Sequence, residues 1–383
     1  MIRPPSGWAR GSHARRRAIW AGCLALVVLA VGAVVLATRP HGTAEAPTRA
    51  QRKPTLHTEE SRTPAQRRLF AAGSPWNREL PANPALDGRS SARVAELAGQ
   101  VEGQIAKGGY PAVAASSYST PVYVVGARQP KVPLRLDTGS WGDDLRRALA
   151  PGVPIPKSAK PAAGTDAHMT IYQPSTDRLW EFWGTSKRPD GWHARWGGAM
   201  QHVSTDVGYY TRSAWPGLRA WQGWNWGSTA SSLPVAAGLI TGKELRTGKI
   251  DHALAVAIPT PCARVFAWPA QRTDGTAQPP NCIPEGARLR LDPKVDVASL
   301  GLSPVAAKIA RAAQTYGLIV RDRTGGSVSF YAEDVTTAGR GAYARTVWGN
   351  DPWWKMLDRF PWRRLQVLEM KLCSRAPCQS ARR

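Results

Sequence analysis

An uncharged apolar run near the N-terminus constrains the fold of this chain more than any other feature. Residues 18–38 read AIWAGCLALVVLAVGAVVLAT, 21 positions without a charge. A helix of that length, at about 1.5 Å per residue, spans the roughly 30 Å apolar core of a bilayer. Five arginines and no acidic residue precede it in the basic tail 1–17. We therefore expect a single transmembrane helix contacting membrane lipid, with the N-terminus in the cytoplasm.

Everything after residue 38 is then expected outside the cytoplasm, in a cell-membrane protein with one pass. A cleaved signal peptide, which would make the protein secreted, stays open because small residues lie near the end of the apolar run. The cysteines agree with export. Cys23 lies in the apolar run, which leaves an even set that is typical of disulfides. Local pairing is favoured among the three connectivities, Cys262 with Cys282 and Cys373 with Cys378.

The net charge of +24 is concentrated at the ends of the chain. The tail 1–17 has five arginines, and residues 355–383 carry eight basic and two acidic side chains. Basic ends near a membrane favour anionic lipid or an anionic wall polymer as partners, although a merely solvated basic surface would look the same. Nucleic acid is excluded as a partner by the compartment rather than by the charge.

Composition changes divide the exported part into three regions. Residues 39–72 are rich in Pro, Thr and charge without an apolar period, which predicts a flexible stalk. Residues 73–350 contain many short β-branched runs separated by Pro and Gly, which predicts a mainly β ectodomain of sandwich or jelly-roll type with two or three helices. Residues 351–383 form a basic aromatic C-terminal segment with a last strand over 365–373.

Three helices and one hairpin are predicted inside the ectodomain. Apolar residues at helical spacing predict a helix over 92–107 that Ser90 or Ser91 caps. A second helix is expected after Ser303, because Pro304 suits the first helical position, and a short third helix over 243–246. The strands on either side of 323–326 are expected to form a hairpin with a Gly-containing loop.

A tryptophan-rich stretch over 180–226 gathers the candidate functional side chains. It holds eight of the 17 tryptophans. Because alternate residues of a strand face opposite sides, Glu181 and Trp183 share one face of a strand over 178–183. Neighbouring strands are expected to bring the following side chains to one polar face rimmed by aromatic rings: His168, Tyr172, Glu181, His193 and Arg195.

Such a face suits a polysaccharide, because the apolar side of a sugar ring packs on indole and charged side chains reach its hydroxyls and carboxylates. Glu181 is the candidate acid of a glycosidase, which needs a second carboxyl. His193 and Arg195 suit a lyase, in which His193 would take a proton from the sugar and Arg195 would neutralise a uronate carboxylate. The aromatic residues expected to contact the substrate are Trp183, Trp192, Trp196, Tyr209 and Tyr210. The alternative interpretation is that the tryptophans fill a core and the polar residues are their satisfied neighbours.

A second, shorter pattern is Asp137-Thr138-Gly139-Ser140 after an apolar strand, which matches the signature of aspartic proteases. Their mechanism needs two aspartates that share a proton, and the sequence has no second Asp-Thr-Gly. Nucleophile-elbow, P-loop, dinucleotide-binding and paired-Cys or HExxH patterns are absent, so neither a metal nor a cofactor is expected.

These patterns together predict a carbohydrate-active or carbohydrate-binding protein acting on an envelope polysaccharide, and they leave open whether it is an enzyme. The alternatives are a non-catalytic structural or interaction protein of the cell envelope and an aspartic-type peptidase using Asp137. Several segments also resemble an uncharacterised family of exported actinobacterial proteins, over roughly residues 73–335: DRLWEFWG, GWHARWGGAM, GKIDHALAVAIP, FAWPAQRTDG, YGLIVRD and SFYAED. The resemblance implies export and one compact β-rich domain, and it lends no catalytic residue.

Overall fold

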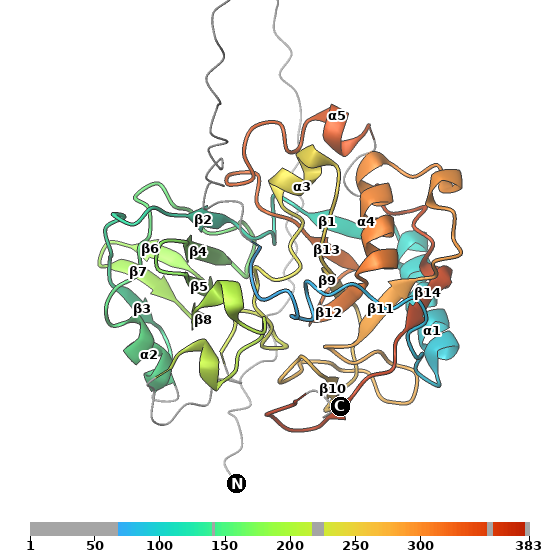
Figure 1. The fold of residues 1–383 in the computed structure, drawn as a ribbon, viewed down its shortest axis with the longest axis horizontal. Helices are drawn as coiled ribbons and strands as arrows, with labels where there is room; N and C mark the ends of the chain where they lie inside the picture. The colour runs from blue at the N-terminus through green and yellow to red at the C-terminus, as the bar shows by residue number, and fades with distance from the viewer. Residues whose placement is uncertain (1–67, 140–141, 217–225, 351–354, 380–383) are drawn as a thin grey trace, which may run out of the picture. The chain divides into compact units, whose positions relative to one another are not determined.

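The computed structural model describes residues 68–139, 142–216, 226–350 and 355–379, in which sheets dominate and helices are few (Figure 1). The predicted membrane segment 18–38 and most of the stalk lie outside these residues. Within the described ranges, no helix is both long and apolar enough to cross a membrane. The folded chain begins slightly before the predicted boundary at residue 73, because Phe70 is buried and its N–H donates to the Val203 carbonyl at 3.0 Å.

One half of the fold is built on a six-stranded mixed sheet. In spatial order its strands are β1 (Ala112–Ala114), β13 (Ser329–Tyr331), β9 (Leu254–Ile258), β12 (Leu318–Arg323), β11 (Arg288–Leu291) and β14 (Leu365–Val367). Helices α1 (Ser90–Ala106) and α4 (Pro304–Thr315) cover one face of this sheet. On β9 the larger Leu254, Val256 and Ile258 belong to that helix-side core, whereas Ala255 and Ala257 belong to the core of the other half. Small residues on this second face let the two halves approach closely.

The other half contains two smaller sheets around the tryptophan-rich stretch. A four-stranded sheet orders β2 (Val122–Val124), β4 (Met169–Gln173), β5 (Arg178–Trp183) and β8 (Trp196–Gln201). A three-stranded sheet orders β3 (Leu134–Leu136), β7 (Gly191–Ala194) and β6 (Ser186–Arg188), and helix α2 (Asp143–Leu149) packs beside β3 and β8. The remaining elements are β10 (Phe266–Ala267), β15 (Leu372–Cys373), α3 (Gly242–Thr247), α5 (Arg345–Trp348) and four short 3₁₀ helices at Val203–Thr205, Arg212–Ala214, Val297–Leu300 and Trp362–Arg364.

The mainly β prediction is confirmed, but the sheets differ from an antiparallel jelly-roll. Four pairings are parallel: β1 with β13, β9 with β12, β2 with β4, and β3 with β7. Parallel neighbours need a crossover, so each pair joins strands separated in sequence, and Ala112 for example lies opposite Ser329. The spacing of short strands along a sequence does not reveal such pairings.

The predicted helices are confirmed, and one predicted cap is wrong. Ser303 caps α4 by accepting a hydrogen bond from Ala306 N–H, with Pro304 at the first position. Helix α1 begins at Ser90 instead of being capped by it, because the Ser90 hydroxyl accepts the N–H of Val367 in β14 at 2.9 Å. Strand β14 therefore takes the Ser90 hydroxyl that the local sequence predicted as the cap of α1.

The hairpin predicted around residues 323–326 is wrong, because β9 lies between β12 and β13. Strand β12 runs parallel to β9, and β13 runs antiparallel to it. After β12 the chain crosses the end of β9, where Thr324 N–H donates to the Ile258 carbonyl at 3.0 Å. The Gly-containing loop makes that crossing instead of a tight turn.

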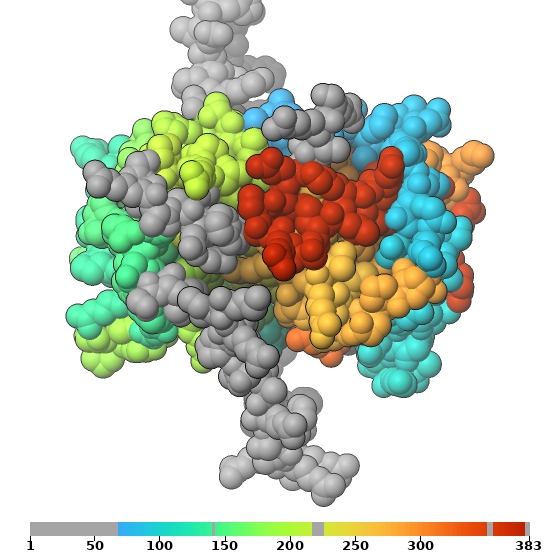
Figure 2. Space-filling view, turned by 90° about the horizontal axis from the view of Figure 1, so that it is seen from below, coloured from blue at the N-terminus to red at the C-terminus, as the bar shows by residue number. Residues whose placement is uncertain are grey.

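Both predicted disulfides are confirmed, Cys262 with Cys282 and Cys373 with Cys378. The predicted last strand over 365–373 is divided into two short strands in different sheets, since β14 joins the large sheet and β15 pairs with β10. This pairing places the C-terminal segment, red in Figure 2, against the gold segment that carries the first disulfide. The two disulfides thus stabilise adjoining loops.

A buried loop joins the two halves. Residues 226–240 are buried apart from the half-buried Ala230, and a buried loop needs partners for its backbone groups. From one side, Glu181 of β5 accepts the N–H groups of Ser228 and Val235 at 2.9 and 2.7 Å. From the other side, Arg321 of β12 donates to the Val235 carbonyl at 2.6 Å and to the Ala237 carbonyl at 3.1 Å. The loop is therefore held between a carboxylate and a guanidinium.

Arg321→Met is expected to lower the free energy of unfolding by about 3–5 kcal/mol, because it removes a buried cation and leaves two buried carbonyls without donors. Urea unfolding followed by tryptophan fluorescence measures the change. The matched control is Arg323→Met on the same strand, whose exposed pair with Asp274 contributes less than about 1 kcal/mol. Equal losses in the two variants would contradict the role assigned to Arg321.

Candidate functional site

The three-stranded sheet positions a cluster of charged side chains on its outer face. Leu134 and Leu136 of β3 point into the core, so Arg135 between them points outward. The register places Arg135 opposite His193 of β7, and His193 opposite Ser186 of β6. Asp137 directly follows β3, and Asp190 lies in the turn between β6 and β7, so the strand ends bring both carboxylates to His193.

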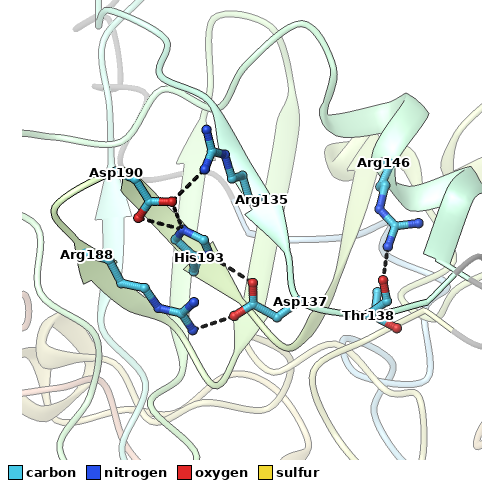
Figure 3. Close-up of polar contacts among 7 residues, drawn as sticks. All are labelled: Arg135, Asp137, Thr138, Arg146, Arg188, Asp190 and His193. Atoms are coloured by element: carbon cyan, nitrogen blue, oxygen red, sulfur yellow. Dashed lines mark hydrogen bonds and ion pairs between the residues drawn. The ribbon is translucent and has the colours of Figure 1, made fainter.

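His193 lies between two aspartates (Figure 3). Its Nδ1 is 2.8 Å from Asp137 Oδ1, and its Nε2 is 3.1 Å from both carboxylate oxygens of Asp190. Arg188 pairs with Asp137, and Arg135 pairs with Asp190, so each carboxylate also meets a guanidinium. The five side chains form one continuous network, in which each aspartate lies between a guanidinium and the imidazole. Both ring nitrogens donate only when the imidazole is protonated, which is the form that satisfies both aspartates.

The electrostatics of this charged cluster keep both carboxylates ionised. The hydrogen bond from His193 lowers the pKa of Asp137, and Arg188 lowers it further. For Asp190 desolvation is the largest single cause and raises the pKa, but the hydrogen bond and charge of His193 together with the charge of Arg135 outweigh it, so the pKa is lowered. An aspartic-protease pair needs one protonated carboxyl. The arrangement around Asp137 gives no support to that chemistry.

An open cavity of about 370 Å³ adjoins the charged cluster and shares Arg135 and Asp190 with it. Its volume lies within the range of small-ligand sites. The walls combine apolar surface with cationic side chains: Val132, Pro133, Arg135, Ile155, Pro156, Lys157, Lys187, Asp190, Gly191 and Trp192. The Lys187 ammonium lies 5.6 Å from the centre of the Trp192 ring. We call this the Trp192 pocket.

The expected single polar face around the tryptophans is divided in the structure. Glu181 lies on the four-stranded sheet and His193 on the three-stranded sheet. Glu181 is fully buried against the loop that joins the two halves, and burial raises its pKa to about 7 against the lowering effect of the two N–H donors. Its side chain has no exposed surface and does not line the Trp192 pocket.

His168, another residue expected on the polar face, also has a structural role. Its Nε2 lies 3.0 Å from the Ser228 carbonyl, which identifies the nitrogen that carries the proton because a carbonyl only accepts. Burial lowers its pKa to about 4, so the ring is neutral. His168 and Glu181 therefore hold the carbonyl and the N–H of the same residue.

The predicted aromatic residues are mostly part of the core. Trp192, Trp196 and Tyr210 are buried, while Trp183 and Tyr209 are half-buried. Arg195 is exposed and stacks on the Trp183 ring at 5.5 Å, away from the polar chain through His193. Of the predicted residues, Asp137, His193 and Trp192 lie at the charged cluster and its pocket.

Sequence reasoning missed most of the cations at this site. Arg135, Arg188, Lys157 and Lys187 come from three separate segments, and no spacing links them. The alternation Leu-Arg-Leu in β3 does place Arg135 outside, but the parallel pairing of β3 with β7 is what brings it to His193. The two strands are far apart in the sequence, so their pairing cannot be read from local spacing.

The chain matches no family model, no curated protein and no solved structure. Function has to be argued from the site itself, because a fold alone does not specify one.

Replacing His193 by Asn is expected to change the acid dependence of stability. Because the folded pKa of Asp137 lies below its unfolded value of about 3.9, the stabilisation is present above that value and is lost as the pH falls through the folded pKa. His193→Asn should therefore lower the urea midpoint at pH 6, with a smaller difference from the parent at pH 3.

His202→Asn is the matched control, because His202 is exposed and its side chain contacts no carboxylate of the described ranges. Its urea midpoint should follow that of the parent at both pH values. A His193→Asn difference of the same size at pH 6 and pH 3 would show that the charged cluster does not contribute through ionised aspartates.

Proposed function

We propose that this protein binds an acidic polysaccharide of the cell envelope through the Trp192 pocket. The observation that supports this most is one open cavity in which three cationic side chains stand beside two prolines and the mostly buried Trp192. A sugar ring packs its apolar face on the apolar wall of the cavity, and a carboxylate or phosphate on the ring pairs with Lys or Arg. Neutral glycans would use only half of this surface.

The charge distribution favours an anionic ligand. The one acidic residue in the pocket wall, Asp190, is already paired with Arg135 and His193. Lys157 and Lys187 are exposed and face the cavity without a further carboxylate among the described wall residues. A ligand carboxylate or phosphate supplies the charge that these two ammonium groups lack.

The same geometry favours binding over cleavage. A general base needs a nitrogen lone pair that reaches the substrate proton. Both nitrogens of His193 face aspartates, and the charges of Arg188 and Arg135 occupy the far side of those aspartates. Glu181 is buried away from the pocket. We propose that the chain of charge holds Arg135 and the pocket wall rigid, which lowers the entropic cost of binding.

The place of action we propose is the outside of the cell membrane, with the apolar segment 18–38 as anchor. Two disulfides hint at an oxidising compartment. Burial of Trp192, Trp196 and Trp215 favours a second candidate, a structural envelope protein without a glycan ligand, in which aromatic side chains serve only as core. The two functions differ in whether glycan binds.

Titration of the full-length chain in detergent micelles with acidic and neutral oligosaccharides tests the proposal, with isothermal titration calorimetry as the measurement. One arm uses oligouronates, a second uses a glycerol-phosphate oligomer, and a third uses neutral β-glucan oligomers. We expect binding of an acidic ligand that weakens as salt is added, because exposed charge pairs are screened. The two acidic arms identify carboxylate or phosphate as the anion.

The double variant Lys157→Gln/Lys187→Gln is expected to raise the Kd of the acidic ligand about 3- to 10-fold for each lysine, on the scale of about 0.7–1.4 kcal/mol per contact. Lys243→Gln/Lys294→Gln removes the same charge from exposed positions elsewhere and should leave the Kd unchanged. Absence of acidic-glycan binding, or equal affinity for neutral glycans, would exclude the proposed function in favour of the structural one.

A further inference from the structure

Three carboxylates meet at the base of the loop that the first disulfide closes. Asp274 lies inside the Cys262–Cys282 loop, Glu285 follows that loop before β11, and Asp322 lies on β12. One oxygen of each lies within 4.8 Å of an oxygen of the other two. Oxygens that share a Ca²⁺ ion at about 2.3–2.6 Å are at most about 5 Å apart. The separation therefore fits three ligands of one ion.

Glu285 is the side chain that distinguishes this cluster from a solvated acidic patch. It is fully buried, and neither of its carboxylate oxygens has a partner at ordinary hydrogen-bond geometry, although the Thr273 and Asp274 side chains lie close enough to influence its pKa. A buried carboxylate without a donor is costly, since proteins pair or coordinate such groups. Both Glu285 oxygens are thus free to coordinate, in the bidentate manner that Ca²⁺ often takes from carboxylates.

The local backbone aims the three groups at one point. The register between β12 and β9 shifts between Val320 and Asp322, and such an irregularity re-aims the side chains that follow it. Asp322 is therefore half-buried at the side of Glu285 rather than continuing the alternation of the strand. Asp274 approaches from the exposed side of the loop, which gives an ion an entry path.

We propose that Asp274, Glu285 and Asp322 bind one divalent cation, and that this cation is Ca²⁺. Hard oxygen ligands without nitrogen or sulfur favour Ca²⁺ and Mg²⁺ over transition metals. Mg²⁺ holds its ligands at about 2.0–2.1 Å in strict octahedral geometry, whereas Ca²⁺ accepts the wider and less regular set seen here. This site lies apart from the Trp192 pocket, and the proposal is independent of glycan binding.

Burial lowers the pKa of Arg272 to about 10, and Glu285 and then Asp322 are the carboxylates that most oppose this lowering, so Arg272 lies near enough to the cluster to interact with it. Arg272 donates to the carbonyls of Thr229 and Ala230, and Arg321 donates to carbonyls of the buried loop. Arg323 reaches Asp274 through one oxygen at 3.2 Å and leaves Glu285 without a donor. Burial, and after it the neighbouring carboxylates of Asp322 and Asp274, raise the pKa of Glu285 well above its usual range, so an ion that binds there displaces a proton from Glu285.

Equilibrium dialysis of the full-length chain against ⁴⁵Ca²⁺, after treatment with a chelator, measures the site directly. We expect one ion per chain with a Kd between about 10⁻⁴ and 10⁻³ M, the range of extracellular Ca²⁺ sites. Binding to the folded state alone should also raise the Tm by about 2–4 °C in 10 mM Ca²⁺. Equimolar Mg²⁺ should raise it by less.

Two variants and a control make the result decisive. Glu285→Gln keeps the side-chain shape and should abolish both the bound ion and the Tm shift. Asp274→Asn lies on the exposed side, so it keeps the fold even where Glu285→Gln does not, and should raise the Kd at least tenfold. Glu369→Gln removes an exposed charge elsewhere and should bind as the parent does. No stoichiometric ion in the parent, or equal binding by Asp274→Asn, would overturn the proposal.

Discussion

The two halves of this fold depend on a buried loop whose backbone groups are satisfied by charges from opposite sides. Glu181 contributes a carboxylate from the four-stranded sheet, and Arg321 contributes a guanidinium from the six-stranded sheet. Such groups are costly to bury, and together they satisfy N–H and carbonyl groups that have no strand partner. Arg321 also lies 3.9 Å from the centre of the Tyr331 ring, which adds a cation–π contact within its own half. The geometry makes Glu181 part of the architecture.

Because Glu181 is committed to the interior, the charged chemistry available to a ligand lies on the outer face of the small sheet. There the Asp137–His193–Asp190 chain uses its hydrogen-bonding capacity on itself, and the adjoining Lys157 and Lys187 stay exposed at the cavity. A rigid polar scaffold beside an open cationic pocket favours a binding protein over a hydrolase. The carboxylate cluster below the disulfide loop would add a separate, stabilising cross-link.

The sequence was informative about local features and poor at pairings. Strand content, α4 with its Ser303 cap and both disulfides follow from residue types and short spacings. The predicted Ser90 cap is wrong because the distant Val367 donates its N–H to the Ser90 hydroxyl. The predicted hairpin at 323–326 is wrong because β9, also distant in sequence, lies between the two strands. Strand alternation predicted His193 and Trp192 as site residues. Arg135 reaches the site through the parallel pairing of β3 with β7, and Lys157 reaches it on a loop, and neither is visible in the local sequence. Alternation predicts which side a residue faces, but it does not predict what lies on that side.

The central claim is that the Trp192 pocket receives an acidic sugar. A crystal structure of the protein grown with a saturating acidic oligosaccharide tests it most directly. We predict density for a sugar ring against the prolines of the pocket, with its anionic group within hydrogen-bond distance of Lys157 and Lys187 and with His193 still held between its two aspartates. Oligosaccharide bound at another surface while the pocket stays empty would contradict the account.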